Sequence, residues 1–66
     1  MKQTRKLSDG AFAVSEGGSW VTGCYESEKA ALLACDKEPD ALKALWESCL
    51  ASGRETLTLA EVEALP

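Results

Sequence analysis

Few of the residue types that carry out acid–base chemistry occur in this chain of 66 residues. Histidine, which general acid–base catalysis uses most often, is absent. Carboxylates recur at i, i+2 spacing, as in Glu26 and Glu28, Glu38 and Asp40, and Glu61 and Glu63. These pairs lie at the starts or on the solvent faces of expected helices, where acidic side chains complement the helix dipole. We therefore expect structural carboxylates and no enzymatic activity.

The three cysteines, Cys24, Cys35 and Cys49, are the remaining candidates for nucleophiles or metal ligands. They show no C-x-x-C spacing, and no histidine is present to complete a four-ligand zinc site. A cysteine nucleophile needs a neighbouring base, and no such signature adjoins them. Cys35 and Cys49 fall on apolar sides of expected helices, where a free cysteine behaves as a small hydrophobic residue. We expect no metal, no cofactor and no structural disulfide.

Two patterns suggest nucleotide or DNA sites but fail in detail. The glycine pair Gly17-Gly18 lacks the spacing of a phosphate-binding loop and leads into an extended run. A helix-turn-helix formed by the last two helices would present Glu61 and Glu63 to DNA, with no lysine or arginine. We expect a turn at the glycines and no DNA-reading helix.

Charge is distributed unevenly along the chain, whose net charge is −4. Lys2, Arg5 and Lys6 give the first six residues a charge of +3, whereas the other sixty carry four basic and eleven acidic residues. An acidic body repels phosphate, which disfavours binding of nucleic acid by the body. We expect residues 1–8 to form a flexible basic arm and residues 9–66 to form one small domain.

Composition points to a globular domain, because 45% of the residues are hydrophobic and 27% are charged. No apolar run is long enough to cross a membrane. The basic start is not followed by an apolar stretch, as it would be in a signal peptide. We expect a cytoplasmic protein with reduced thiols.

The segment between Pro39 and Gly53 has the clearest structural pattern. Apolar residues recur there at helical spacing: Leu42, Leu45, Trp46, Cys49 and Leu50. Proline suits the first turn of a helix, and glycine suits the left-handed position just after the last turn. The pattern predicts an amphipathic helix whose apolar stripe organises the core.

Two shorter helices flank this one. Ser27 is a good N-cap for a helix that continues to Cys35. Thr58 and Glu61 have the spacing of a capping box, which predicts a last helix over 59–65.

The N-terminal part predicts a β-hairpin, because two β-compatible runs, 11–15 and 19–22, flank Gly17-Gly18. A two-residue turn there sets four cross-strand pairs: Val14 with Val21, Phe12 with Gly23, Ser15 with Trp20, and Ala13 with Thr22. The first two pairs face the core, and the other two face away from it. The extended residues Glu55–Leu57 are a candidate third strand. The fold class is thus α+β: a small single domain in which the hairpin packs on two to three short helices.

The aromatic residues carry the remaining functional signal. We expect Phe12 and Trp46 in the core, whereas the register places Trp20 outward and Tyr25 follows the strand. Exposed aromatic residues with a polar rim anchor many protein–protein interfaces. We predict a partner-binding surface made of Trp20 and Tyr25 with Glu26 and Glu28 as its rim. The alternative is that a helix covers this face and buries Trp20.

Several short strings along the chain form a wider pattern. They are the hairpin ending Trp20-x-x-Gly23-x-Tyr25, the alanine-rich helix around Ala30-Ala31, and the element Leu57-Thr58-x-x-Glu61. In this pattern the chain resembles small uncharacterised phage and prophage proteins, although Val62 follows Glu61 where leucine is more usual. The resemblance implies a phage origin, and it transfers no functional residues.

We predict a small non-enzymatic module that binds another protein or a second copy of itself, of the kind encoded by phages as accessory proteins. Two alternatives stay open. One is an acidic inhibitor that occupies the basic groove of a host nucleic-acid-binding machine. The other is a small DNA-contacting regulator that uses the basic arm.

Overall fold

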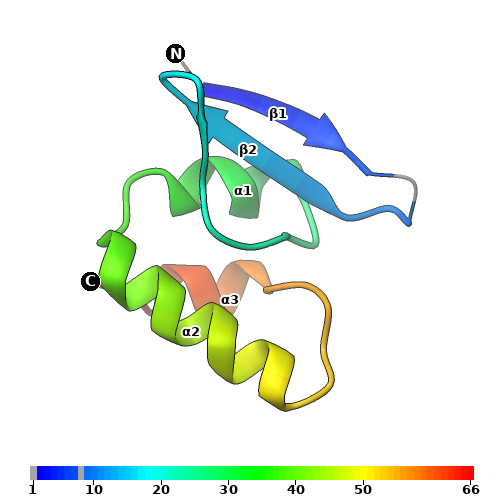
Figure 1. The fold of residues 1–66 in the computed structure, drawn as a ribbon, viewed down its shortest axis with the longest axis vertical. Helices are drawn as coiled ribbons and strands as arrows, with labels where there is room; N and C mark the ends of the chain where they lie inside the picture. Colours follow the sequence, from blue (N-terminus) through cyan, green and yellow to red (C-terminus); the bar gives the residue numbers. More distant parts are fainter. Residues whose placement is uncertain (1, 8) are drawn as a thin grey trace.

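The computed structural model describes residues 2–7 and 9–66. In these residues three strands precede three helices: β1 (Lys2–Lys6), β2 (Phe12–Glu16), β3 (Ser19–Trp20), α1 (Glu28–Ala34), α2 (Pro39–Ala51) and α3 (Leu59–Glu63). The strands form one antiparallel sheet in the order β1-β2-β3, and the helices lie on one side of it (Figure 1). The predicted α+β class is confirmed.

The hairpin turn has the predicted register. Gly17 and Gly18 both have positive φ, at 62° and 88°, and Ser15 pairs with Trp20. The backbone N–H of Val21 donates to the carbonyl of Val14 over 2.9 Å. Positive φ at both turn positions is what a type I′ two-residue hairpin turn requires, so the local sequence alone sets this register.

The predicted pairing of Phe12 with Gly23 is wrong. Phe12 instead pairs with Tyr25, and each residue's N–H donates to the other's carbonyl over 2.8 Å. Gly23 has φ 104°, a conformation that bends the chain after Val21. Two additional residues are thereby accommodated before the pairing with β2 resumes at Tyr25.

The third strand is β1, which pairs with β2 from Lys2 opposite Glu16 to Lys6 opposite Phe12. The N–H of Leu7 extends the pairing to the carbonyl of Ala11 over 2.7 Å. The prediction of a flexible arm is therefore wrong for residues 2–7, while Met1 and Ser8 lie outside the described residues. The backbone of this segment pairs with β2 along its whole length, and Lys2 adds an ion pair with Asp36.

The candidate strand Glu55–Leu57 is reduced to one parallel bridge between Leu57 and Tyr25. The N–H of Leu57 donates to Cys24, and the N–H of Glu26 donates to Leu57, over 2.9 and 3.0 Å. The backbone at Tyr25 is thus bonded on one side to β2 and on the other to the segment before α3.

The three predicted helices are confirmed. Ser27 caps α1, its side chain accepting a hydrogen bond from the N–H of Ala30 over 3.2 Å. Thr58 and Glu61 form the predicted capping box at the start of α3, which ends at Glu63. No helix in residues 2–7 and 9–66 is long and apolar enough to cross a membrane.

The apolar stripe of α2 is confirmed except at its end. Leu42 and Cys49 are buried, and Leu45 and Trp46 are half-buried against the core. Leu50, which the periodicity places in the stripe, is 51% exposed. Cys49 precedes it in the same last turn of α2 and is buried, so the covered side of this turn is narrower than the apolar stripe.

The core runs between the sheet and the helices, with α1 sandwiched between the sheet and the α2–α3 layer (Figure 1). Its buried residues are Val14, Tyr25, Ala30, Ala31, Ala34, Leu42, Cys49, Leu57 and Val62. All three alanines belong to α1, and their small side chains allow the helix to be covered on two sides. The sheet therefore has a single face in the core.

We predict that Leu42→Ala lowers the free energy of unfolding by about 2–5 kcal/mol, because Leu42 is fully buried in α2. Leu50→Ala is the matched control in the same helix and should change stability by less than about 0.5 kcal/mol. Urea unfolding followed by circular dichroism measures both. Equal effects of the two substitutions would contradict the assigned face of α2.

Candidate functional site

Trp20 lies on the face of the sheet that the helices leave uncovered. It is the cross-strand partner of Ser15 and is 61% exposed. Side chains alternate between the two faces of a strand, and Val14, next to Ser15, points into the core. The prediction of an outward Trp20 is confirmed, and the alternative of a covering helix is wrong.

The same alternation shows on which face of the sheet each side chain of β1 lies. Thr4 bonds to Glu28 and Lys2 to Asp36, each over 3.0 Å, so both face α1 and the turn that follows it. The intervening residues face away from the helices. Five residues therefore share what we call the outer sheet face: Gln3, Arg5, Ala13, Ser15 and Trp20.

The outer sheet face has a chemistry of its own. The small side chains of Ala13 and Ser15 lie along β2, between exposed Arg5 on β1 and exposed Trp20 on β3. An indole and a guanidinium are the side chains that most often dominate protein–protein interfaces. The face can therefore offer an apolar aromatic contact and a hydrogen-bonding cation to one ligand.

Tyr25 is fully buried, so the prediction that it belongs to an outward surface is wrong. Its hydroxyl donates to the carbonyl of Thr22, and burial raises the pKa of the phenol well above its ordinary value. A Cβ added at Gly23 would lie 3.2 Å from the Tyr25 hydroxyl and 3.4 Å from the Trp46 ring. Gly23 thus lets the Tyr25 hydroxyl and the Trp46 ring both lie close to its backbone, a packing that the W-x-x-G-x-Y spacing alone does not reveal.

Glu26 and Glu28 are exposed as predicted, but they serve the fold. Glu26 accepts a hydrogen bond from the N–H of Leu59 at the start of α3, and Glu28 accepts one from Thr4, each over 3.0 Å. Glu28 begins α1, whereas Trp20 borders a cavity of about 260 Å³ at the other end of that helix, near Cys35. The structure does not bring the four predicted residues together on one surface.

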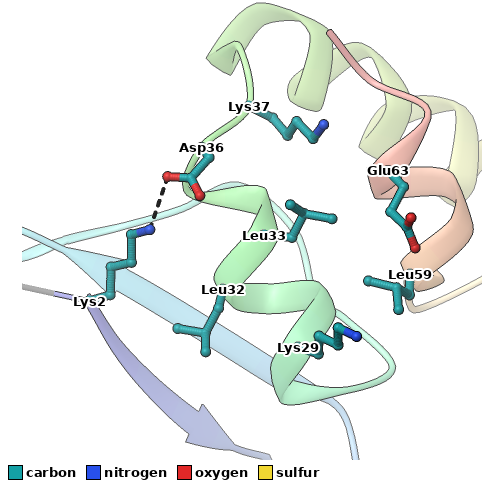
Figure 2. Close-up of a pocket in the computed structure, with 8 residues that line it drawn as sticks. All are labelled: Lys2, Lys29, Leu32, Leu33, Asp36, Lys37, Leu59 and Glu63. Carbon is teal, nitrogen blue, oxygen red and sulfur yellow. Dashed lines mark hydrogen bonds and ion pairs between the residues drawn. The ribbon is translucent and has the colours of Figure 1, made fainter.

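A larger groove of about 540 Å³ lies between α1 and α3, and no sequence pattern pointed to it. Figure 2 shows Leu33 and Lys29 of α1 on one side, and Leu59 and Glu63 of α3 on the other. Its cations are partly engaged within the protein: Lys2 pairs with Asp36 over 3.0 Å. Lys37 likewise donates to the carbonyl of Leu65 over 2.9 Å. Three lysines and two carboxylates alternate around the groove, so its formal net charge is only +1 and gives weak selection for an anionic ligand.

The cysteines occupy packing positions. Cys49 is buried, and its thiol lies 3.5 Å from the carbonyl of Thr56. Burial raises the pKa of Cys24 and of Cys35, which disfavours the thiolate that a nucleophile or a zinc ligand needs. Within the described ranges, no group of three cysteine, aspartate or glutamate side chains is arranged to hold a metal ion.

Comparison with known proteins yields no relative. No protein-family model, curated protein or solved structure matches the chain. The resemblance to phage and prophage proteins therefore stays a prediction.

We predict that Trp20 emits as a water-exposed indole when Trp46→Phe removes the other tryptophan. Its emission should be red-shifted and readily quenched by acrylamide, because 61% of the residue is exposed. In the matched variant Trp20→Phe, the half-buried Trp46 should emit further to the blue and be quenched more slowly. A protected Trp20 in a protein that sediments as a monomer would contradict the outer position.

A second prediction concerns Glu61, another acidic residue whose role is structural. Hydrogen bonds from the Arg54 guanidinium and from Thr58 lower the pKa of Glu61 to about 2. A carboxylate whose pKa falls on folding stabilises the fold above its unfolded pKa, and this contribution is lost as the pH falls through the folded pKa. The window here runs from about 4.5 down to about 2.

Glu61→Gln should therefore lower the melting temperature at pH 7, and its difference from the parent should vanish near pH 2. Glu63→Gln removes the same charge from the same helix and serves as the control. Melting curves at several pH values compare the three proteins. An undiminished difference at pH 2 would contradict the ionic role of Glu61.

Proposed function

We propose that the chain is a small non-enzymatic module that binds another protein through the outer sheet face. The observation that carries this proposal is Trp20, a large aromatic residue that is 61% exposed and lies outside the core cluster of the described residues. Most of the surface of that side chain is therefore available to a partner. An indole held on a rigid strand is suited to anchoring a partner, because little conformational freedom is lost on binding.

A protein fits the outer sheet face better than a nucleic acid does. Sites for single strands combine stacking aromatics with several cations that follow the backbone. Among the described residues, Arg5 is the one cation that shares this face with Trp20, and the chain as a whole is acidic. We infer a protein partner, which includes the case of a second copy, and in keeping with the phage resemblance we infer an accessory role in the cytoplasm.

The proposal predicts that Trp20→Ala weakens partner binding about 30-fold, the loss expected for an interface residue worth about 2 kcal/mol. Leu50→Ala is the matched control, because Leu50 is the other large hydrophobic residue exposed in the described part of the chain. It should change the affinity by less than about threefold. Titration calorimetry with the purified partner compares the three proteins.

The partner is identified beforehand by placing a photo-crosslinking amino acid at position 20, and at position 50 as the control, in cells that express the protein. A protein cross-linked at position 20 only, including a second copy of the chain, supports the proposal. Equal cross-linking at both positions, or a product that nuclease destroys, would overturn it. Sedimentation equilibrium of the purified chain identifies self-association.

A further inference from the structure

β1 is an edge strand whose outer side faces no other element of the described chain (Figure 1). The alternation of antiparallel hydrogen bonds shows which of its backbone groups are free. On β2, the backbone N–H and C=O groups of Phe12 and Val14 point away from β1. Phe12 exchanges hydrogen bonds with Tyr25, and the carbonyl of Val14 accepts from Val21. In an antiparallel sheet, the backbone groups of successive residues point alternately to the two sides of the strand, so the residues next to Phe12 and Val14 direct theirs toward β1. These neighbours, Ala13 and Ser15, therefore bond to β1.

The partners of Ala13 and Ser15 on β1 are Arg5 and Gln3. The same alternation continues beyond the strand, where Leu7 donates to Ala11 over 2.7 Å. The backbone N–H and C=O groups of the other β1 residues, Lys2, Thr4 and Lys6, must therefore point to the open side. Unpaired groups of this kind form a template on which another extended chain can pair.

The side chains of β1 determine which chain can pair there. All three charged residues of the strand are basic, and Lys2 is held by Asp36. Within residues 2–7 and 9–66, neither Arg5 nor Lys6 belongs to an ion pair. The free edge thus carries positive charge that the domain itself does not neutralise.

A second copy of this chain is a poor occupant of the edge. Two β1 strands paired antiparallel about Thr4 would place Lys2 of each copy opposite Lys6 of the other. Like charges directly opposite one another destabilise a strand pair, and lysine at an edge is a common protection against self-pairing. Carboxylates on an acidic strand paired with β1 would instead be attracted by its basic side chains.

We propose that the free edge of β1 binds an extended acidic segment of a partner protein by strand addition. The segment pairs with the backbone of Thr4 and Lys6, and its carboxylates lie beside Arg5 and Lys6. Backbone hydrogen bonds supply affinity, and the charges select the segment. This inference rests on the proposed protein-binding function and adds a second contact next to the outer sheet face.

The test uses a fluorescein-labelled seven-residue peptide with glutamate at its three central positions and threonine elsewhere, so that carboxylates lie on both faces of the added strand, beside Arg5 and beside Lys6. Its binding is measured by fluorescence anisotropy, and the amide signals of Thr4 and Lys6 are followed by NMR. We expect saturable binding that weakens with salt and shifts those two amides most. A peptide with lysine in place of glutamate should bind at least tenfold more weakly.

Two substitutions at one position separate backbone pairing from charge attraction. Thr4→Pro removes an outward N–H that does not pair with β2, and proline is tolerated at such edge positions. Thr4→Val is the matched control, because it keeps the N–H and loses only the side-chain bond to Glu28. We expect Thr4→Pro to weaken peptide binding at least tenfold and Thr4→Val to weaken it less than threefold.

The same peptide with N-methyl groups on alternate residues tests backbone pairing without changing the protein. It should bind at least tenfold more weakly than the parent peptide. Equal binding of the methylated peptide, or equal binding to the Thr4→Pro and Thr4→Val proteins, would overturn strand addition. Equal binding of the lysine peptide would overturn selection of an acidic segment. If the glutamate peptide fails while a partner is still cross-linked at position 20, the edge proposal alone is wrong.

Discussion

The extended segment around Tyr25 holds the two halves of the chain together. On one side Tyr25 exchanges two backbone hydrogen bonds with Phe12 of β2, and on the other its neighbours bond to Leu57. Its side chain is fully buried, with its hydroxyl on the carbonyl of Thr22. The sheet, the entry to α1 and the entry to α3 are thereby tied to three successive residues. Other contacts of the core depend on this junction, because it determines where α3 lies against α1.

α1 explains why the sheet has one free face. Its buried alanines pack toward the sheet and toward the helical layer, so one short helix serves as the middle layer of the domain. All three helices then lie on the same side of the sheet. The outer sheet face is left to solvent, and with it the exposed indole of Trp20.

Charge is segregated in space as well as along the chain. The acidic body holds the basic strand β1 through the contacts of Lys2 with Asp36 and of Thr4 with Glu28. β1 in turn contributes Arg5 to the outer sheet face and exposes its free backbone edge. The two candidate binding surfaces therefore adjoin one another on the one basic element of an acidic domain. A partner with an apolar patch and an acidic extended segment would contact both.

Features that depend on a few neighbouring residues were predictable from the sequence. The Gly17-Gly18 turn sets the hairpin register and with it the outward position of Trp20. Ser27 and the capping box of Thr58 and Glu61 mark the starts of α1 and α3 because caps act within one turn. Features that depend on distant contacts were not predictable. Leu50 has the right spacing for the core, but the last turn of α2 is covered on the side of Cys49 and leaves Leu50 exposed.

The tertiary structure alone decided the roles of Tyr25 and of the basic N-terminal segment. Tyr25 is buried because Gly23 bends the chain and Leu57, thirty-two residues later, pairs beside it. Lys2–Lys6 has no apolar alternation, so its strand follows from the unpaired edge of β2 and from acidic partners at Glu28 and Asp36. Pairing between segments far apart in the chain leaves no periodic signal in either one, because each is stabilised by a surface that exists only after folding.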